Sequence, residues 1–212
     1  MTSLETGENN NNFILGPDLG SIKRKTVQTP PPLVVQYCAT VLDSIIQIHH
    51  HVSIVVDAMY VNYLTFMVTV SNILKYTTSI YLKSWRKTQL VLVLTKFIQL
   101  YSKYGFVVHF INGDKKFDTL RDDFHRVYFN ITASDEHVSE AELNIIVVKE
   151  RTCSVQHTLP FSKIPEKIIT RVVNFSMFWI NNFPVSSDVG GNFIPTTIIT
   201  CCTIDFVVNF KL

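Results

Sequence analysis

Residues 51–71 read HVSIVVDAMYVNYLTFMVTVS and predict two adjacent β-strands. The first run, from Val52 to Val56, is apolar on both faces, which is typical of a strand in the middle of a sheet. Asp57 follows it directly. In the second run, residues 64–71, apolar side chains alternate mostly with threonine and serine, as in a strand with two different faces. This stretch therefore predicts the middle of a β-sheet.

Apolar spacing on the C-terminal side of this stretch predicts the remaining elements. They are a strand over 72–82, a helix over 88–104, a strand over 106–111, a polar helix over 118–126, a strand over 127–131, and helices over 138–149 and 164–183. The helix over 88–104 has the clearest apolar stripe, with Thr88 and Gly105 as its expected caps. Strands interspersed with helices indicate an α/β fold with one mixed sheet.

Composition divides the chain into four parts. Residues 1–32 contain an asparagine run and a proline triplet, which predict a disordered tail. Residues 33–48 are compatible with a helical lead-in, and residues 49–183 hold the main folded body. Residues 184–212 are expected to be an irregular or extended C-terminal extension. A length of 212 residues suits one domain of this kind.

Charge and cysteine content exclude several classes of protein. With 47% hydrophobic and 17% charged residues, the chain is too apolar for disorder and too poor in charge for a coiled coil. No uncharged run predicts a membrane span, and the N-terminus does not resemble a secretory signal. The four cysteines lack the spacing of a zinc site. We expect reduced thiols and a nuclear or cytoplasmic protein without a membrane partner.

Carboxylates follow two of the predicted strands. Asp57 comes after the first, Asp114 comes after the fourth, and a third could come from Glu136, Glu140 or Glu142 near a helix start. If these strands are neighbours, the carboxylates lie at one end of the sheet. Oxygen ligands favour Mg²⁺ or Mn²⁺, and two such ions can support phosphodiester chemistry.

Each acid also has a purely structural interpretation. Asp57 could end a strand, and Asp114 could be a turn residue after Asn112-Gly113. Glu142 follows Ser139 by three residues, which is the spacing of a capping box. Spacing alone leaves both interpretations open.

Five blocks of sequence stand in order along the chain. They are VVDAMYVNYLTFMVTVS (55–71), FINGDKKFDTLR (110–121), SDEHVSEAELNIIVVKER (134–151), TLPFSKIP (158–165) and FWINNFPVS (178–186). Together they resemble the integrase region of copia-type LTR retrotransposon polyproteins, from about Ile48 onward. The resemblance implies an integrase-like catalytic core over 49–183. It also implies a ribonuclease-H-like fold, with a mixed five-stranded sheet flanked by helices.

The same resemblance implies a function and its residues. Asp57 and Asp114 match the two aspartates of the family and Glu142 its glutamate, whereas Glu140 and Glu136 fit less well. The three acids would bind two Mg²⁺ or Mn²⁺ ions and process and join DNA strands. The expected partners are retroelement ends and target DNA, and a homo-oligomer is compatible with the family.

Three lysines are candidate contacts for the DNA backbone. Lys149 lies seven residues after Glu142 and so on the same helical face, while Lys115 and Lys116 follow Asp114. The alternative interpretation is a solvated helix face for Lys149 and a polar loop for the other two.

The chain also departs from the family. Leu143 and Ile146 stand where close relatives have arginine, and His49 to His51 have no C-x-x-C partner for a zinc module. We interpret the chain as a truncated copy. One alternative is therefore a catalytically inactive relic that keeps the fold and weak nucleic-acid binding. Another is an unrelated α/β interaction protein that uses no metal.

Overall fold

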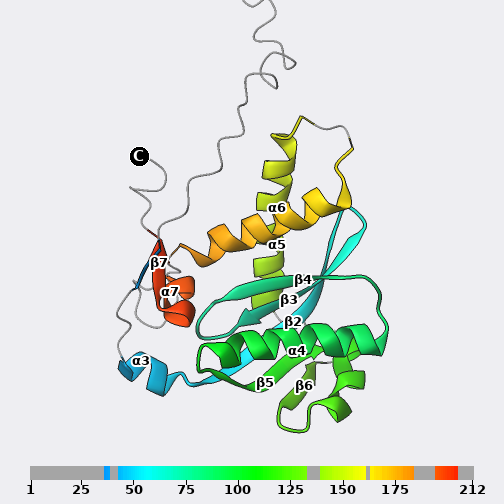
Figure 1. The fold of residues 1–212 in the computed structure, drawn as a ribbon. Coiled ribbons are helices and arrows are strands. Elements are labelled where there is room, and N and C mark those ends of the chain that lie inside the picture. Colours follow the sequence, from blue (N-terminus) through cyan, green and yellow to red (C-terminus); the bar gives the residue numbers. More distant parts are fainter. Residues whose placement is uncertain (1–35, 39–42, 133–138, 161–162, 184–193, 205–212) are drawn as a thin grey trace, which may run out of the picture. The chain divides into compact units, whose positions relative to one another are not determined.

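The computed structural model describes residues 36–38, 43–132, 139–160, 163–183 and 194–204 (Figure 1). The elements are β1 (Gln36–Cys38), α3 (Asp43–Ile48), β2 (His51–Val61), β3 (Leu64–Ser71), β4 (Thr77–Leu82), α4 (Lys87–Lys103), β5 (Val107–Asp114), the 3-10 helix η1 (Lys115–Asp123), β6 (Tyr128–Thr132), α5 (Ser139–His157), α6 (Glu166–Asn181), α7 (Pro195–Thr200) and β7 (Cys202–Ile204). The tail predicted over 1–32 lies outside these residues.

Five strands form one mixed sheet in the order β4-β3-β2-β5-β6 (Figure 1). The β2-β3 and β3-β4 pairs are antiparallel, whereas β5 lies parallel to β2 and β6 parallel to β5. Asn62 and Tyr63 both have positive φ and close the β2-β3 hairpin, a geometry that matches the twist of paired strands. The predicted α/β fold, with a mixed five-stranded sheet flanked by helices, is confirmed.

Helices pack on both faces of this sheet. Ile54 and Val56 of β2 belong to an apolar cluster that includes the buried residues of α4, such as Phe97. Met59 and Val61 belong to a second cluster with α5 and α6. Since successive strand residues point to opposite faces, the side chain of the residue after Val56 lies on the α5 side. That residue is Asp57.

Outside the main sheet, the structure differs from the sequence prediction at both ends. Within the described part of 33–48, the expected helix is present at Asp43–Ile48, whereas Gln36–Cys38 is a strand that pairs with β7. Residues 195–200, expected to be irregular or extended, form α7. Its Ile198 and Ile199 are buried in the α4-side cluster. Such short segments take their structure from burial, because isolated helices of this length are unstable.

The bounds of the inner elements shift for local reasons. Helix α4 has Arg86 as its N-cap, without a side-chain hydrogen bond, so the expected Thr88 cap is wrong. Gly105 ends it as predicted, with a φ of 83°. The strand expected from residue 72 begins only at Thr77, since Lys75 adopts positive φ in the preceding turn. The polar helix forms earlier, as η1. Among the described helices, none is both long and apolar enough to cross a bilayer.

Candidate active site

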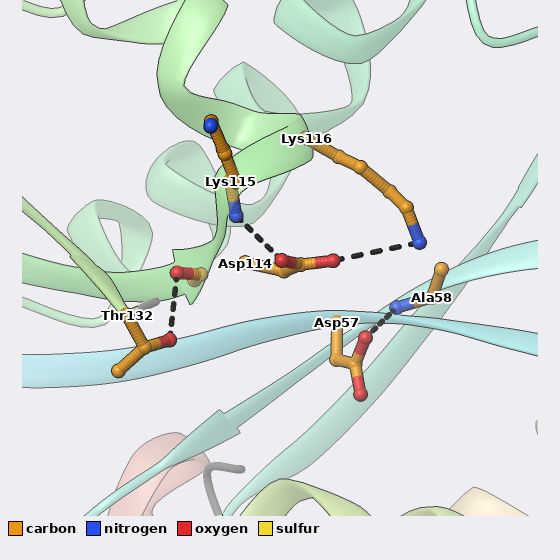
Figure 2. Close-up of polar contacts among 7 residues, drawn as sticks. Asp57, Ala58, Asp114, Lys115, Lys116 and Thr132 are labelled. Atoms are coloured by element: carbon orange, nitrogen blue, oxygen red, sulfur yellow. Dashed lines mark hydrogen bonds and ion pairs between the residues drawn. The ribbon is translucent and has the colours of Figure 1, made fainter. Parts of the chain in front are cut away.

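Asp57 lies within the central strand and on the sheet face that α5 covers. The strand continues beyond it to Val61, so the interpretation of Asp57 as a strand terminator is wrong. The backbone N–H of Ala58 donates a hydrogen bond of 2.6 Å to Oδ1 of Asp57 (Figure 2). A strand position that follows three buried residues therefore holds a half-buried carboxylate, which the Ala58 N–H orients.

Asp114 is the last residue of the neighbouring parallel strand β5. Val56 pairs with Gly113, so Asp57 and Asp114 each follow a member of the same pair and lie side by side. The N–H of Lys115 donates to Oδ1 of Asp114 at 2.6 Å, so this aspartate also caps η1. The sequence left open whether Asp114 is a turn residue or a site residue, and the structure places it at the end of β5, where it caps η1 and lies beside Asp57.

Lys116 and Thr132 complete the surroundings of Asp114. The Nζ atom of Lys116 lies 3.4 Å from Oδ2 of Asp114 and forms an ion pair with it (Figure 2). The Thr132 hydroxyl donates to the Gly113 carbonyl at 3.1 Å and attaches the end of β6 to β5. The sequence predicts Lys116 against DNA, whereas the ion pair with Asp114 had one usable signal, a lysine two residues after a strand-end aspartate.

Glu142 lies in the first turn of α5 and is partly exposed. Ile145 and Val148 of the same helix are buried against residues of β2 and β3, which fixes α5 over the face that carries Asp57. Glu142 acts electrostatically on Asp57. Glu136 and the side chains of Glu140 and Ser139 lie outside the described residues, and so does the predicted capping box.

The pKa of Asp57 depends on its burial and on the charged residues around it. Burial raises the pKa of the Asp57 carboxyl above its ordinary value of 3.8, while the Ala58 N–H lowers it by stabilising the charged form. The negative charges of Asp114 and Glu142 raise this pKa further, and the Lys116 ammonium lowers it. The two other predicted acids and one predicted lysine thus all act on the Asp57 carboxyl.

The donor chemistry of this region suits hard divalent cations, which bind carboxylate oxygens. In the part of the chain that the structure describes, however, no three His, Cys, Asp or Glu side chains are close enough together to hold one ion. Asp114 and Glu142 thus act electrostatically on Asp57 without the three acids forming a set of ligands. Lys116 supplies positive charge to Asp114 and Asp57 in this arrangement.

The other predicted DNA contacts are accessible. Lys115 is exposed at the start of η1, and Lys149 is partly exposed on α5. Leu143 and Ile146, the two positions where the sequence resemblance implies arginine, are 63% and 49% exposed. The solvent-facing side of α5 therefore carries apolar side chains next to Glu142.

Comparisons with known proteins identify the fold. No protein-family model and no curated protein matches the sequence. The structure is similar to the catalytic core domain of BIV integrase, with a TM-score of 0.53 and 14% sequence identity, over 69% of this chain and 92% of that domain. At this identity the similarity establishes the fold alone, which is the ribonuclease-H-like fold of an integrase catalytic core.

Proposed function

We propose that this chain is an integrase-like polynucleotidyl transferase core, of copia-type retrotransposon origin, that processes and joins DNA strands. One observation carries the proposal. Asp57 and Asp114 lie side by side on neighbouring parallel strands, and the charge of Glu142 acts on Asp57. The fold of an integrase core supports the proposal, and the resemblance of the five sequence blocks supplies the substrate class.

The three acids would hold two Mg²⁺ or Mn²⁺ ions. When bound, such ions activate an attacking water or 3′ hydroxyl and stabilise the leaving oxygen of a phosphodiester. The chain prepares their ligands in advance, because the N–H groups of Ala58 and Lys115 orient the carboxylates of Asp57 and Asp114. The positive charge of bound ions would relieve the repulsion among the acids.

Lysines beside the acids would hold the DNA backbone. The exposed Lys115 and the partly exposed Lys149 lie near the two sides of the acidic region, on η1 and on α5. Ammonium groups bind phosphates as point charges. Lys116 would exchange Asp114 for a phosphate once other cations neutralise the aspartate. DNA ends and target DNA are the proposed ligands, with no base-specific contact implied.

A second candidate function is a catalytically inactive relic that still binds nucleic acid weakly. Exposed Leu143 and Ile146 favour it, because apolar side chains occupy two positions of the proposed DNA face where cations would bind phosphate. It is favoured as well by the spacing of the acids, which form no three-residue ligand group among the described residues. This candidate predicts DNA binding without any uptake of divalent ions by the acids.

A titration of the full chain with Mn²⁺ and Mg²⁺ distinguishes the two functions. An active core should bind the ions. Calorimetry measures the heat of binding, and the electron paramagnetic resonance signal of Mn²⁺ measures how much of this ion is bound. At an ion concentration of about 100 times Kd, the ions should stabilise the fold by roughly 2.7 kcal/mol. The same protein should nick or join a retroelement-end duplex. If the protein binds DNA but shows neither heat of ion binding nor a rise in melting temperature with the ions, it is the catalytically inactive relic.

The double substitution Leu143→Arg and Ile146→Arg should strengthen DNA binding. Both side chains are exposed, so the fold should tolerate the change within about 0.5 kcal/mol. Each new phosphate contact should steepen the dependence of log K on log salt by about 0.7 to 0.9. Fluorescence anisotropy with a labelled duplex at several salt concentrations measures both effects.

The matched control is Leu92→Arg together with Val107→Arg. These side chains are exposed at 48% and 43% but belong to α4 and to the beginning of β5. If the control pair strengthens DNA binding as much as the α5 pair, the effect comes from the added net charge, and the prediction that α5 contacts DNA is wrong.

A further inference from the structure

A cavity of about 560 Å³ lies where β2, the start of α4 and η1 meet, and one of its lining residues, Lys116, pairs with Asp114. Its volume falls within the range of about 300–1,000 Å³ that is usual for ligand pockets. The lining residues are Tyr60, Trp85, Lys87, Leu90, Lys116 and Thr119. Two of them are aromatic and two are cationic, and none is acidic.

The aromatic walls are held by packing on the opposite side of each element. Met59 and Val61 are buried with α5 and α6, so Tyr60 between them points to the α4 side of the sheet, where it is 52% exposed. The ring of Trp85 is 38% exposed and lies 6.5 Å from that of the buried Phe117. The cavity therefore presents accessible rings on a fixed support.

Phe117 also connects the Trp85 wall with the acidic region. It packs on Gly113, where an added Cβ atom would lie 3.3 Å from the Phe117 ring. Gly113 precedes Asp114 directly. The absence of a side chain at this position lets the aromatic support approach the strand that carries the aspartate, so the distance between cavity and aspartate is set by direct packing.

The cations of the cavity are both held by acids at its margin. Lys87 Nζ lies 2.9 Å from Asp123 Oδ2, and Lys116 Nζ lies 3.4 Å from Asp114 Oδ2. Lys116 thus lines the cavity and also forms the ion pair with Asp114 that Figure 2 shows. A ligand that combines a flat ring with a phosphate would meet both kinds of lining residue. An uncharged aromatic ligand would contact the rings but would form no ion pair with the ammonium groups.

We propose that this cavity binds one unpaired nucleotide of a DNA strand, with its base against Trp85 and Tyr60 and its phosphate at Lys116. The next phosphodiester of that strand would then lie at Asp57 and Asp114. This inference rests on the proposed function for its choice of a DNA strand, but the binding itself requires no metal. Stacking on aromatic rings accepts any base, so the pocket sets the position of the strand without reading its sequence.

The intrinsic fluorescence of Trp85 tests whether a base reaches the cavity. The chain has two tryptophans, Trp85 and Trp179, so a Trp179→Phe protein reports on Trp85 alone. A short oligothymidylate should quench this signal without metal, whereas an abasic strand of equal length should not. Equal quenching by both strands would overturn base stacking. If thymidine monophosphate quenches the signal with the same affinity as the strand, the ligand is a free nucleotide and the proposal of a DNA strand is wrong.

Affinity measurements on variants of the full chain give the second test. In anisotropy titrations, Tyr60→Ala should weaken binding of the oligothymidylate by about 5- to 100-fold. Lys116→Ala should weaken it too, and should reduce the salt slope by about 1. Matched controls are Tyr63→Ala, a fully exposed tyrosine at the hairpin, and Lys96→Ala, an exposed lysine of α4. Wild-type affinity in Tyr60→Ala would overturn the proposal.

The failure of this proposal differs from a failure of the proposed function. Asp57→Asn protein should still show Trp85 quenching, because the aspartate does not line the cavity. If the protein joins strands but Trp85 does not respond to DNA, the proposed function holds and the nucleotide-binding cavity is wrong. If DNA quenches Trp85 but the protein takes up no ions, the nucleotide-binding cavity holds and the proposed function is wrong.

Discussion

Replacing Asp57 by asparagine is expected to lower metal-dependent strand joining by about 1,000-fold. The reason is that a neutral amide is a poor ligand for a hard cation, and losing several kcal/mol of charge stabilisation at about 1.36 kcal/mol per tenfold gives this factor. The assay is the joining of a retroelement-end duplex in Mn²⁺. Glu150→Gln is the matched control, since Glu150 is an exposed acid of α5 outside the region of Asp57.

The same substitution should raise the melting temperature of the metal-free protein at neutral pH. Because the pKa of Asp57 is raised in the folded state, its contribution to stability is complete below 3.8 and is lost as pH rises through the folded pKa. Asparagine cannot ionise and escapes that loss. Thermal melts at pH 3.5 and pH 7 should therefore show a gain that is larger at pH 7.

These two effects together separate a lost ligand from a damaged fold. A variant that joins strands like wild type would exclude Asp57 from the chemistry. A variant that is both inactive and less stable at neutral pH would indicate that Asp57 mainly supports β2. Substitutions that stabilise a protein while removing its activity are typical of residues kept for function.

Asn181→Ala is expected to cost about 2–6 kcal/mol of folding stability. Asn181, at the end of α6, is buried and holds the edge strand β4 through two hydrogen bonds. Its Oδ1 accepts from the Thr77 N–H at 2.8 Å, and its Nδ2 donates to the Thr77 carbonyl at 2.6 Å. Alanine would leave both backbone groups buried without a partner, and each such group costs about 1–3 kcal/mol.

Urea unfolding measures this cost, and two further variants identify its source. Asn174→Ala, on the exposed side of α6, should change stability by less than about 0.5 kcal/mol. Asn181→Asp keeps the acceptor for the Thr77 N–H but loses the donor, so it should remain less stable than wild type. If Asn181→Ala unfolds like Asn174→Ala, the two hydrogen bonds make no net contribution.

Much of the sheet could be predicted because its strands carry their own patterns. The run from Val52 to Val56 is apolar on both faces, and the structure places it at the centre of the sheet. Helix α4 could also be predicted, from its apolar stripe and from Gly105 at its end. Periodicity of this kind reflects which side of each element meets the core, and it survives without knowledge of the partner.

The short elements at the two ends could not be predicted for the opposite reason. Gln36–Cys38 and Cys202–Ile204 are strands only because they pair with each other across the length of the chain. Asn181 shows the same limit in a side chain. Its sequence block resembled a family block, but nothing local indicated that it binds the backbone of a strand that precedes it by about a hundred residues.

Residue order along the polymer sets which side chains each strand and helix presents, because backbone geometry makes the faces alternate with fixed periods. It therefore places Asp57 on the face opposite Val56, and Glu142 in the first turn of its helix. The parallel pairing of β2 with β5, which puts Asp114 beside Asp57, comes from folding. So does the Lys116 ion pair, which turns a lysine expected against DNA toward an aspartate. Such distances depend on how separate elements pack, and local periodicity contains no information about them.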